Sequence, residues 1–152
     1  MIALAGTVVL AVCAALGAWL DVTTRRLPNW LCLVTACGGL GFMAAESGAI
    51  TAGLALAHST VGLIAGMILF RFGMIGGGDA KFYTASAAWF PITSGLTLLS
   101  AVSLAGLVIV GGWFGYRQFS GARARDAGGK FAMVPYGAAI AAGAVAARLV
   151  LQ

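Results

Sequence analysis

Acidic side chains are scarce in this chain, whose 152 residues include only Asp21, Glu46, Asp79 and Asp126. Charged residues of both signs make up 9% of the sequence, whereas a typical soluble domain has roughly 25%. Hydrophobic residues make up 61%, and the mean hydropathy is +1.01. This composition excludes an ordinary soluble domain. It predicts an all-α membrane protein in which residues 1–152 form a single polytopic domain.

Side chains that bind metals are also few. The chain has one histidine, His58, and three cysteines, Cys13, Cys32 and Cys37, which all lie in apolar segments without a Cys-x-x-Cys pair. We therefore expect neither a zinc site nor a disulfide framework, and we predict no metal and no other cofactor. His58 is expected to be a hydrogen-bonded packing residue of its segment.

The basic residues give the chain a formal net charge of +5. They fall in short gaps between apolar runs, not on a solvated face with interleaved aromatic residues. That distribution is typical of cytoplasmic loops and argues against a nucleic-acid partner.

Six apolar segments predict a bundle of about six transmembrane helices, at residues 2–20, 30–45, 50–70, 80–92, 95–116 and 131–151. This arrangement places eight of the nine basic residues on one side, which the positive-inside rule makes the cytoplasm, and it places both termini outside. The fourth segment is short and contains Pro91. We expect it to be a tilted span that continues past this proline, because a re-entrant segment would break the charge rule.

Several side chains are expected near the ends of the spans. Arg148 is predicted to extend outward to the lipid headgroups, and Glu46 to be solvated in an outer turn. The tryptophans at span ends are predicted to anchor the chain at the membrane interface, namely Trp30, Trp89 and Trp113.

Asp21 and Asp79 each lie at the edge of an apolar run. An ionisable side chain at that depth is costly, so its presence indicates function. With six spans both aspartates lie at the cytoplasmic edge, and a compact bundle can bring them together. Two carboxylates that meet are the minimum equipment for aspartyl-type hydrolysis.

The sequence around each aspartate also has a plainer interpretation. Three glycines, Gly76, Gly77 and Gly78, precede Asp79 and are expected to adopt backbone conformations that other residues avoid. The same stretch could be a flexible turn in which Asp79 caps a helix. The stretch from Asp21 to residue 29 could likewise be an ordinary inner loop.

Together the two segments resemble the motifs of the type IV prepilin peptidase family of membrane aspartyl proteases. The family's first motif is an aspartate followed by a basic stretch and Ile-Pro-Asn. Here it reads Asp21…Arg25-Arg26-Leu27-Pro28-Asn29, with leucine in place of isoleucine. The second motif, Gly-x-Gly-Asp-x-Lys, here reads Gly76-Gly77-Gly78-Asp79-Ala80-Lys81. Val134-Pro135-Tyr136-Gly137 resembles the family's final Pro-aromatic-Gly helix.

The resemblance implies an aspartic endopeptidase that removes the basic leader of type IV prepilins or pseudopilins. It implies a multi-pass protein of the bacterial inner membrane with its active site at the cytoplasmic face. Its implied partners are the prepilin substrate, the lipid bilayer and the pilus assembly machinery. Asp21 and Asp79 are implied to be the catalytic pair; the residues implied to shape the site or bind substrate are Gly76, Gly77, Gly78, Lys81, Pro28 and Asn29. We expect apolar docking of the pilin helix to dominate recognition.

The chain departs from the larger family members, which carry an extra cytoplasmic segment with paired cysteines and methylate the new pilin N-terminus. It resembles the short, peptidase-only form associated with Flp/Tad-type pili. We therefore expect no N-methyltransferase activity.

Other functions remain open at this point. A small ion or proton-coupled transporter could use the two aspartates as ligands, although carboxylates confined to one membrane face argue against a polar path. A non-enzymatic assembly factor is a further alternative. Proteases of the presenilin kind share Gly-x-Gly-Asp, but Leu20 stands where they have tyrosine, and Val134-Pro135-Tyr136 replaces their Pro-Ala-Leu.

Overall fold

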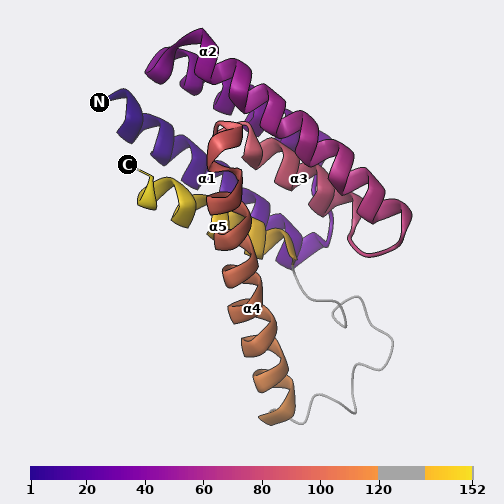
Figure 1. The fold of residues 1–152 in the computed structure, drawn as a ribbon. Helices are drawn as coiled ribbons and strands as arrows, with labels where there is room; N and C mark the ends of the chain where they lie inside the picture. Colours follow the sequence, from indigo (N-terminus) through magenta and orange to yellow (C-terminus); the bar gives the residue numbers. More distant parts are fainter. Residues whose placement is uncertain (120–135, 152) are drawn as a thin grey trace.

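The computed structural model describes residues 1–119 and 136–151, and its regular elements there are all helical, as predicted. In chain order they are α1 (Ile2–Thr24), α2 (Asn29–Arg71), α3 (Gly77–Ala87), the 3-10 turn η1 (Ile92–Ser94), α4 (Gly95–Phe119) and α5 (Tyr136–Val150). Figure 1 shows α1, α2, α3 and α5 gathered in a bundle from which α4 runs away at a steep angle. The N-terminus and the end of α5 lie near each other. The side of the membrane that they face stays a prediction.

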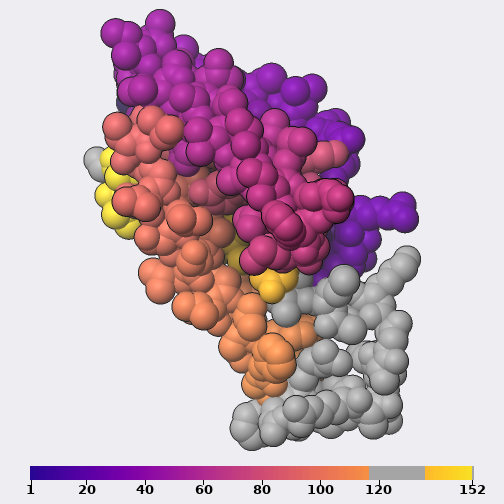
Figure 2. All heavy atoms as spheres, turned by 45° about the vertical axis from the view of Figure 1, so that its right-hand side comes forward, coloured from indigo at the N-terminus to yellow at the C-terminus, as the bar shows by residue number. Residues whose placement is uncertain are grey.

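Three stretches of the described residues are long and apolar enough to cross a membrane: Ile2–Thr24, Asn29–Arg71 and Ile92–Tyr116. In Figure 2, α2 and α4 form much of the visible face. Large apolar side chains are exposed on both helices, among them Ile64 and Met67 on α2 and Leu107 and Val108 on α4. Such surfaces suit contact with lipid. The count of six crossings stays a prediction.

α2 consists of two helices joined at Gly48, whose backbone (φ 86°, ψ 174°) is not helical. The second and third predicted spans both lie within α2, on either side of this residue. Glycine is the residue that adopts such a positive φ without steric cost. The change of direction between the two spans therefore depends on this one position.

α3 differs from the fourth predicted span. The helix ends at Ala87 and is followed by tight turns, in which Trp89 N–H donates to the Ser86 carbonyl (3.1 Å) and Phe90 N–H to the Ala87 carbonyl (3.1 Å). Pro91 is extended (φ −62°, ψ 155°). The predicted continuation of a helix past Pro91 is wrong, because proline lacks the N–H that a helix interior needs and disfavours helical geometry in the preceding residue. With 11 residues, α3 is about 17 Å long, whereas a bilayer core is about 30 Å thick.

α3 and the turn after it supply the largest side chains of the core, and Trp89 is fully buried. A Cβ on Gly39 would lie 2.7 Å from Trp89 Cδ1, so the indole packs directly on the α2 backbone at that glycine. Trp89 Nε1 donates a hydrogen bond to the Thr35 carbonyl (2.9 Å). The prediction that Trp89 anchors the membrane interface is wrong, because a small residue on α2 lets the two elements approach closely enough to enclose the ring.

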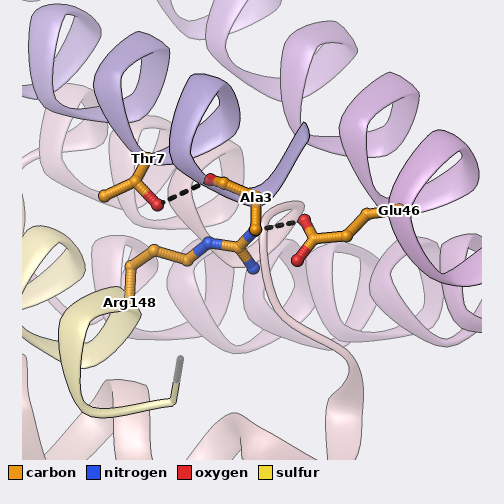
Figure 3. A network of polar contacts seen from close by, with 4 residues as sticks. All are labelled: Ala3, Thr7, Glu46 and Arg148. Carbon is orange, nitrogen blue, oxygen red and sulfur yellow. Dashed lines mark hydrogen bonds and ion pairs between the residues drawn. The ribbon is translucent and has the colours of Figure 1, made fainter. Parts of the chain in front are cut away.

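Arg148 and Glu46 form an ion pair between α5 and α2 (Figure 3). Their side chains are 8% and 22% exposed, and the guanidinium lies beside the first turns of α1, near Ala3 and Thr7. The predictions that Arg148 extends outward and that Glu46 is merely solvated are therefore wrong. The opposite charges offset part of each other's desolvation cost, whereas a lone buried charge would bear that cost in full.

The basic residues expected on the cytoplasmic side between the last two spans fall within residues 117–130. Their side chains lie outside the described residues, and so does Asp126.

Candidate active site

Asp21 lies in the last turn of α1 and is 8% exposed. Its Oδ2 is buried and has no hydrogen-bond partner among the residues that the structure describes. α1 ends at Arg25, which adopts the left-handed conformation (φ 55°, ψ 29°) and donates its N–H to the Asp21 carbonyl (3.2 Å). A buried carboxylate oxygen without a hydrogen bond is energetically costly. The unpaired Oδ2 of Asp21 is therefore suited to accept a hydrogen bond from a ligand.

Gly137 of α5 packs directly against the Asp21 carboxyl group. A Cβ built on this glycine would lie 2.9 Å from both Cγ and Oδ2 of Asp21, closer than real Cβ contacts allow. Glycine is therefore required here so that α5 can approach the carboxylate. The sequence signal for this role is the Pro-aromatic-Gly resemblance, which does not by itself assign Gly137 to the site. Val134 and Pro135 of that motif lie outside the described residues.

Asp79 lies in the first turn of α3, where a carboxylate is favoured by the helix dipole. Burial, and secondarily the negative charge of Asp21, raises the pKa of Asp79 to about 6, and a backbone hydrogen bond from Gly76 opposes the rise. Asp79 can therefore hold a proton at pH values where an ordinary aspartate is ionised.

The three glycines before Asp79 act differently from our expectation. Gly76 has ordinary extended geometry (φ −72°, ψ 144°), and Gly77 and Gly78 belong to α3. Among the described glycines, only Gly48 and Gly73 have positive φ. Gly76 leaves space for the carboxyl, since a Cβ there would lie 2.7 Å from Asp79 Oδ2. A Cβ on Gly77 would be tight, 3.3 Å from the Phe70 ring, and one on Gly78 would make an ordinary contact, 3.5 Å from Leu27 Cβ.

Asp21 and Asp79 line one cavity of about 470 Å³ together with Gly76, Gly77 and Gly78. The other walls come from the α1–α2 loop, the loop before α3 and the start of α5; they include Arg25, Leu27, Met74 and Tyr136. We call this space the aspartate cavity. Two carboxyl groups that are far apart in the sequence therefore face a common space of suitable size for a peptide bond and a water molecule.

Three predicted site residues lie apart from the aspartate cavity. Lys81 is exposed and donates a hydrogen bond through Nζ to Asn29 Oδ1 (3.1 Å). These two residues line a separate shallow groove of about 290 Å³. Pro28 is the N-terminal cap residue of α2, and its carbonyl accepts the Leu31 N–H (3.1 Å). In this arrangement Lys81 and Asn29 tie the start of α2 to α3 and do not touch the carboxylates directly.

Within the described residues, no three side chains of His, Cys, Asp and Glu are grouped closely enough to hold a metal ion. The functional groups of the aspartate cavity are its two carboxyls, the Arg25 guanidinium, the Tyr136 side chain and the backbone of the glycine run.

Residues 8–111 match the model of the type IV leader peptidase family. The chain belongs to this family. The matched region contains both aspartates and the glycine run, whereas Tyr136 and Gly137 lie beyond it. Comparison with curated proteins and with solved structures gives no significant match. Membership of the type IV leader peptidase family identifies the chain as a peptidase and implies a prepilin-type substrate.

Proposed function

We propose that this protein is an aspartic endopeptidase that cleaves the leader of type IV, Flp-like prepilins or pseudopilins at the cytoplasmic membrane face. The observation that carries the proposal is the shared cavity, which Asp21 and Asp79 both line although they lie on different helices. Membership of a leader peptidase family supports the substrate class. Family membership also argues against the transporter alternative, which no feature of the described residues supports.

The two carboxyls have different roles in the proposed mechanism. Asp79, whose pKa is raised to about 6, carries a proton and donates it to the scissile carbonyl oxygen. Asp21 is the carboxylate that takes a proton from the attacking water, and its unpartnered Oδ2 is available for that contact.

The steps balance without a further reactant. Water oxygen bonds to the carbonyl carbon while Asp21 accepts one water proton and Asp79 donates its proton to the carbonyl oxygen. In the resulting diol, the carbon–nitrogen bond breaks as Asp21 donates its proton to the leaving amine. One diol hydroxyl returns a proton to Asp79, which regenerates the starting state and leaves a carboxylic acid on the leader.

Co-expression with a prepilin from the same genome tests the proposal. Asp21→Asn and Asp79→Asn should each abolish the mature pilin band while the enzyme reaches the membrane at its normal level. Asp126→Asn provides a matched control, because it removes a carboxylate at a position to which we assign no catalytic role. Full processing of the prepilin by either Asp21→Asn or Asp79→Asn would refute the aspartyl mechanism.

Mass spectrometry of the mature pilin tests the finer prediction about methylation. We expect a free, unmethylated N-terminus, and a mass increase of one methyl group would overturn that expectation.

A further inference from the structure

A second cavity, of about 520 Å³, begins at Asp79 and extends along the bundle. It lies between the second half of α2, α3 and the start of α4, and α5 contributes Tyr136 and Ile140. Figure 2 looks onto α2 and α4, with the start of α5 visible between them. We call this cavity the apolar groove. Asp79, Ile75 and Tyr136 line both cavities, so the groove adjoins the aspartate cavity.

His58 is the exceptional residue in this groove. It is 5% exposed, and the wall around it consists mostly of aliphatic side chains and glycine, such as Val61, Gly62, Leu96 and Leu99. A polar side chain in such surroundings is costly unless both ring nitrogens have partners. Polar groups buried at membrane depth are in general functional candidates.

The hydrogen bonding of His58 fixes the chemistry that it offers. Nδ1 lies 3.0 Å from the Phe90 carbonyl, and a carbonyl can only accept, so Nδ1 carries the proton. In the neutral imidazole Nε2 is then an acceptor. No described residue forms a hydrogen bond with Nε2, which points toward the start of α4 and lies 3.2 Å from the position of a Cβ on Gly95. Gly95 lines the groove as well.

We propose that the apolar groove receives the hydrophobic helix that follows the scissile bond, and that His58 Nε2 accepts a hydrogen bond from one polar side chain on it. The inference rests on the proposed function. The partner is a hydrogen-bond donor, either a Ser or Thr hydroxyl or a protonated carboxyl. Apolar helices that lack such a donor leave Nε2 unpaired, and the enzyme discriminates against them for that reason.

The register of the recognised side chain follows from the packing of α2. A Cβ on Gly66 would lie 3.0 Å from the Ala80 Cβ, so Gly66 is level with the start of α3 beside Asp79. His58 is eight residues earlier on the same continuous half of α2, which corresponds to about 12 Å along the helix axis. A substrate helix lying alongside would place a residue about eight positions after the scissile bond next to His58.

The experiment measures KM and kcat of the enzyme in proteoliposomes for a set of prepilins. Each prepilin carries either Thr or Val at one of the positions from about six to about ten after the cut. These side chains have the same shape and differ in the hydroxyl. We expect wild-type enzyme to prefer Thr at one position by about 3- to 10-fold in KM, with kcat nearly unchanged.

The diagnostic variant is His58→Asn. The shorter amide can still donate to the Phe90 carbonyl but has no acceptor at the place of Nε2, so the Thr preference should disappear. Ser59→Ala is the matched control, because it removes a neighbouring hydrogen bond to the Thr84 carbonyl (2.9 Å) at a position outside the groove lining. The control should keep the preference.

Two results would overturn the inference: a Thr preference that persists in His58→Asn, or no Thr preference at any scanned position. Asp21→Asn and Asp79→Asn are run in the same assay. Cleavage by either would show that the proposed function has failed. Inactive aspartate variants together with a Thr preference that persists in His58→Asn would show that only the groove inference has failed.

Discussion

Replacement of Gly137 by alanine tests whether α5 helps to form the active site. The new Cβ would lie 2.9 Å from Asp21 Cγ, whereas carbon atoms in good contact are about 3.5–4.0 Å apart. Either the carboxyl or α5 must therefore move by about 0.6–1 Å. A misplacement of about 1 Å in a catalytic group can cost about 100-fold in rate.

We expect Gly137→Ala to lower kcat/KM by about 10- to 100-fold, which is about 1.4–2.7 kcal/mol of transition-state stabilisation. Prepilin cleavage by purified enzyme in proteoliposomes gives this number. The melting temperature of the same preparation is measured alongside, because overpacking costs about 1–3 kcal/mol of folding stability.

Gly53→Ala is the control for the added methyl group, since nothing lies within 4 Å of a Cβ at that helical position. Alanine also has the higher helix propensity, so this variant should retain full activity and stability. A Gly137→Ala enzyme that melts and cleaves like the wild type would refute the argument that α5 sets the position of Asp21.

Two further predictions concern titration and the buried ion pair. The pKa of Asp79 is raised to about 6, and the proposed mechanism needs its proton. Above that pH, log kcat/KM should therefore fall with a slope of about −1 per pH unit, which leaves about 1% of the plateau value at pH 8. A rate profile that is flat from pH 5 to 8 would contradict this role. Arg148→Met, which leaves the partly buried Glu46 without its partner, should destabilise the protein by about 1–3 kcal/mol. Arg148→Met with Glu46→Leu should recover most of the loss. Thermal unfolding in detergent decides the second prediction, which fails if the double variant is no more stable than the single one.

The long helices could be predicted from sequence because length and apolar composition are local properties. The expected spans at residues 2–20 and 95–116 correspond to α1 (Ile2–Thr24) and α4 (Gly95–Phe119). α3 could not be placed in this way. Its apolar residues are buried in protein instead of lipid, and hydropathy alone does not distinguish the two environments. Pro91 is the sequence signal for the end of this helix, and it conflicts with the charge rule, which favours a full span.

Pairings between distant segments could not be predicted either. Arg148 and Glu46 each had a reasonable separate interpretation at the membrane surface. Only the three-dimensional arrangement of α5 and α2 shows that the two charges meet. Trp89 was misplaced for the same reason, because its burial depends on Gly39, a glycine on another helix.

The two aspartates were detectable because the cost of an ionised side chain beside an apolar run does not depend on the details of the fold. The residues that make them a site are of a different kind. Gly76 and Gly137 contribute no chemical group, and their importance lies in a Cβ that would come within 3 Å of Asp79 and Asp21 respectively. Composition and spacing carry no information about such a contact, so a glycine of this kind can be suspected only from a family motif and assigned only from the packing. Each carboxyl of the proposed pair is thus in close contact with a glycine, one before α3 and the other on α5. The position of the Asp21 carboxyl therefore depends on how closely α5 approaches α1, and that of the Asp79 carboxyl on the space at Gly76, just before its own helix.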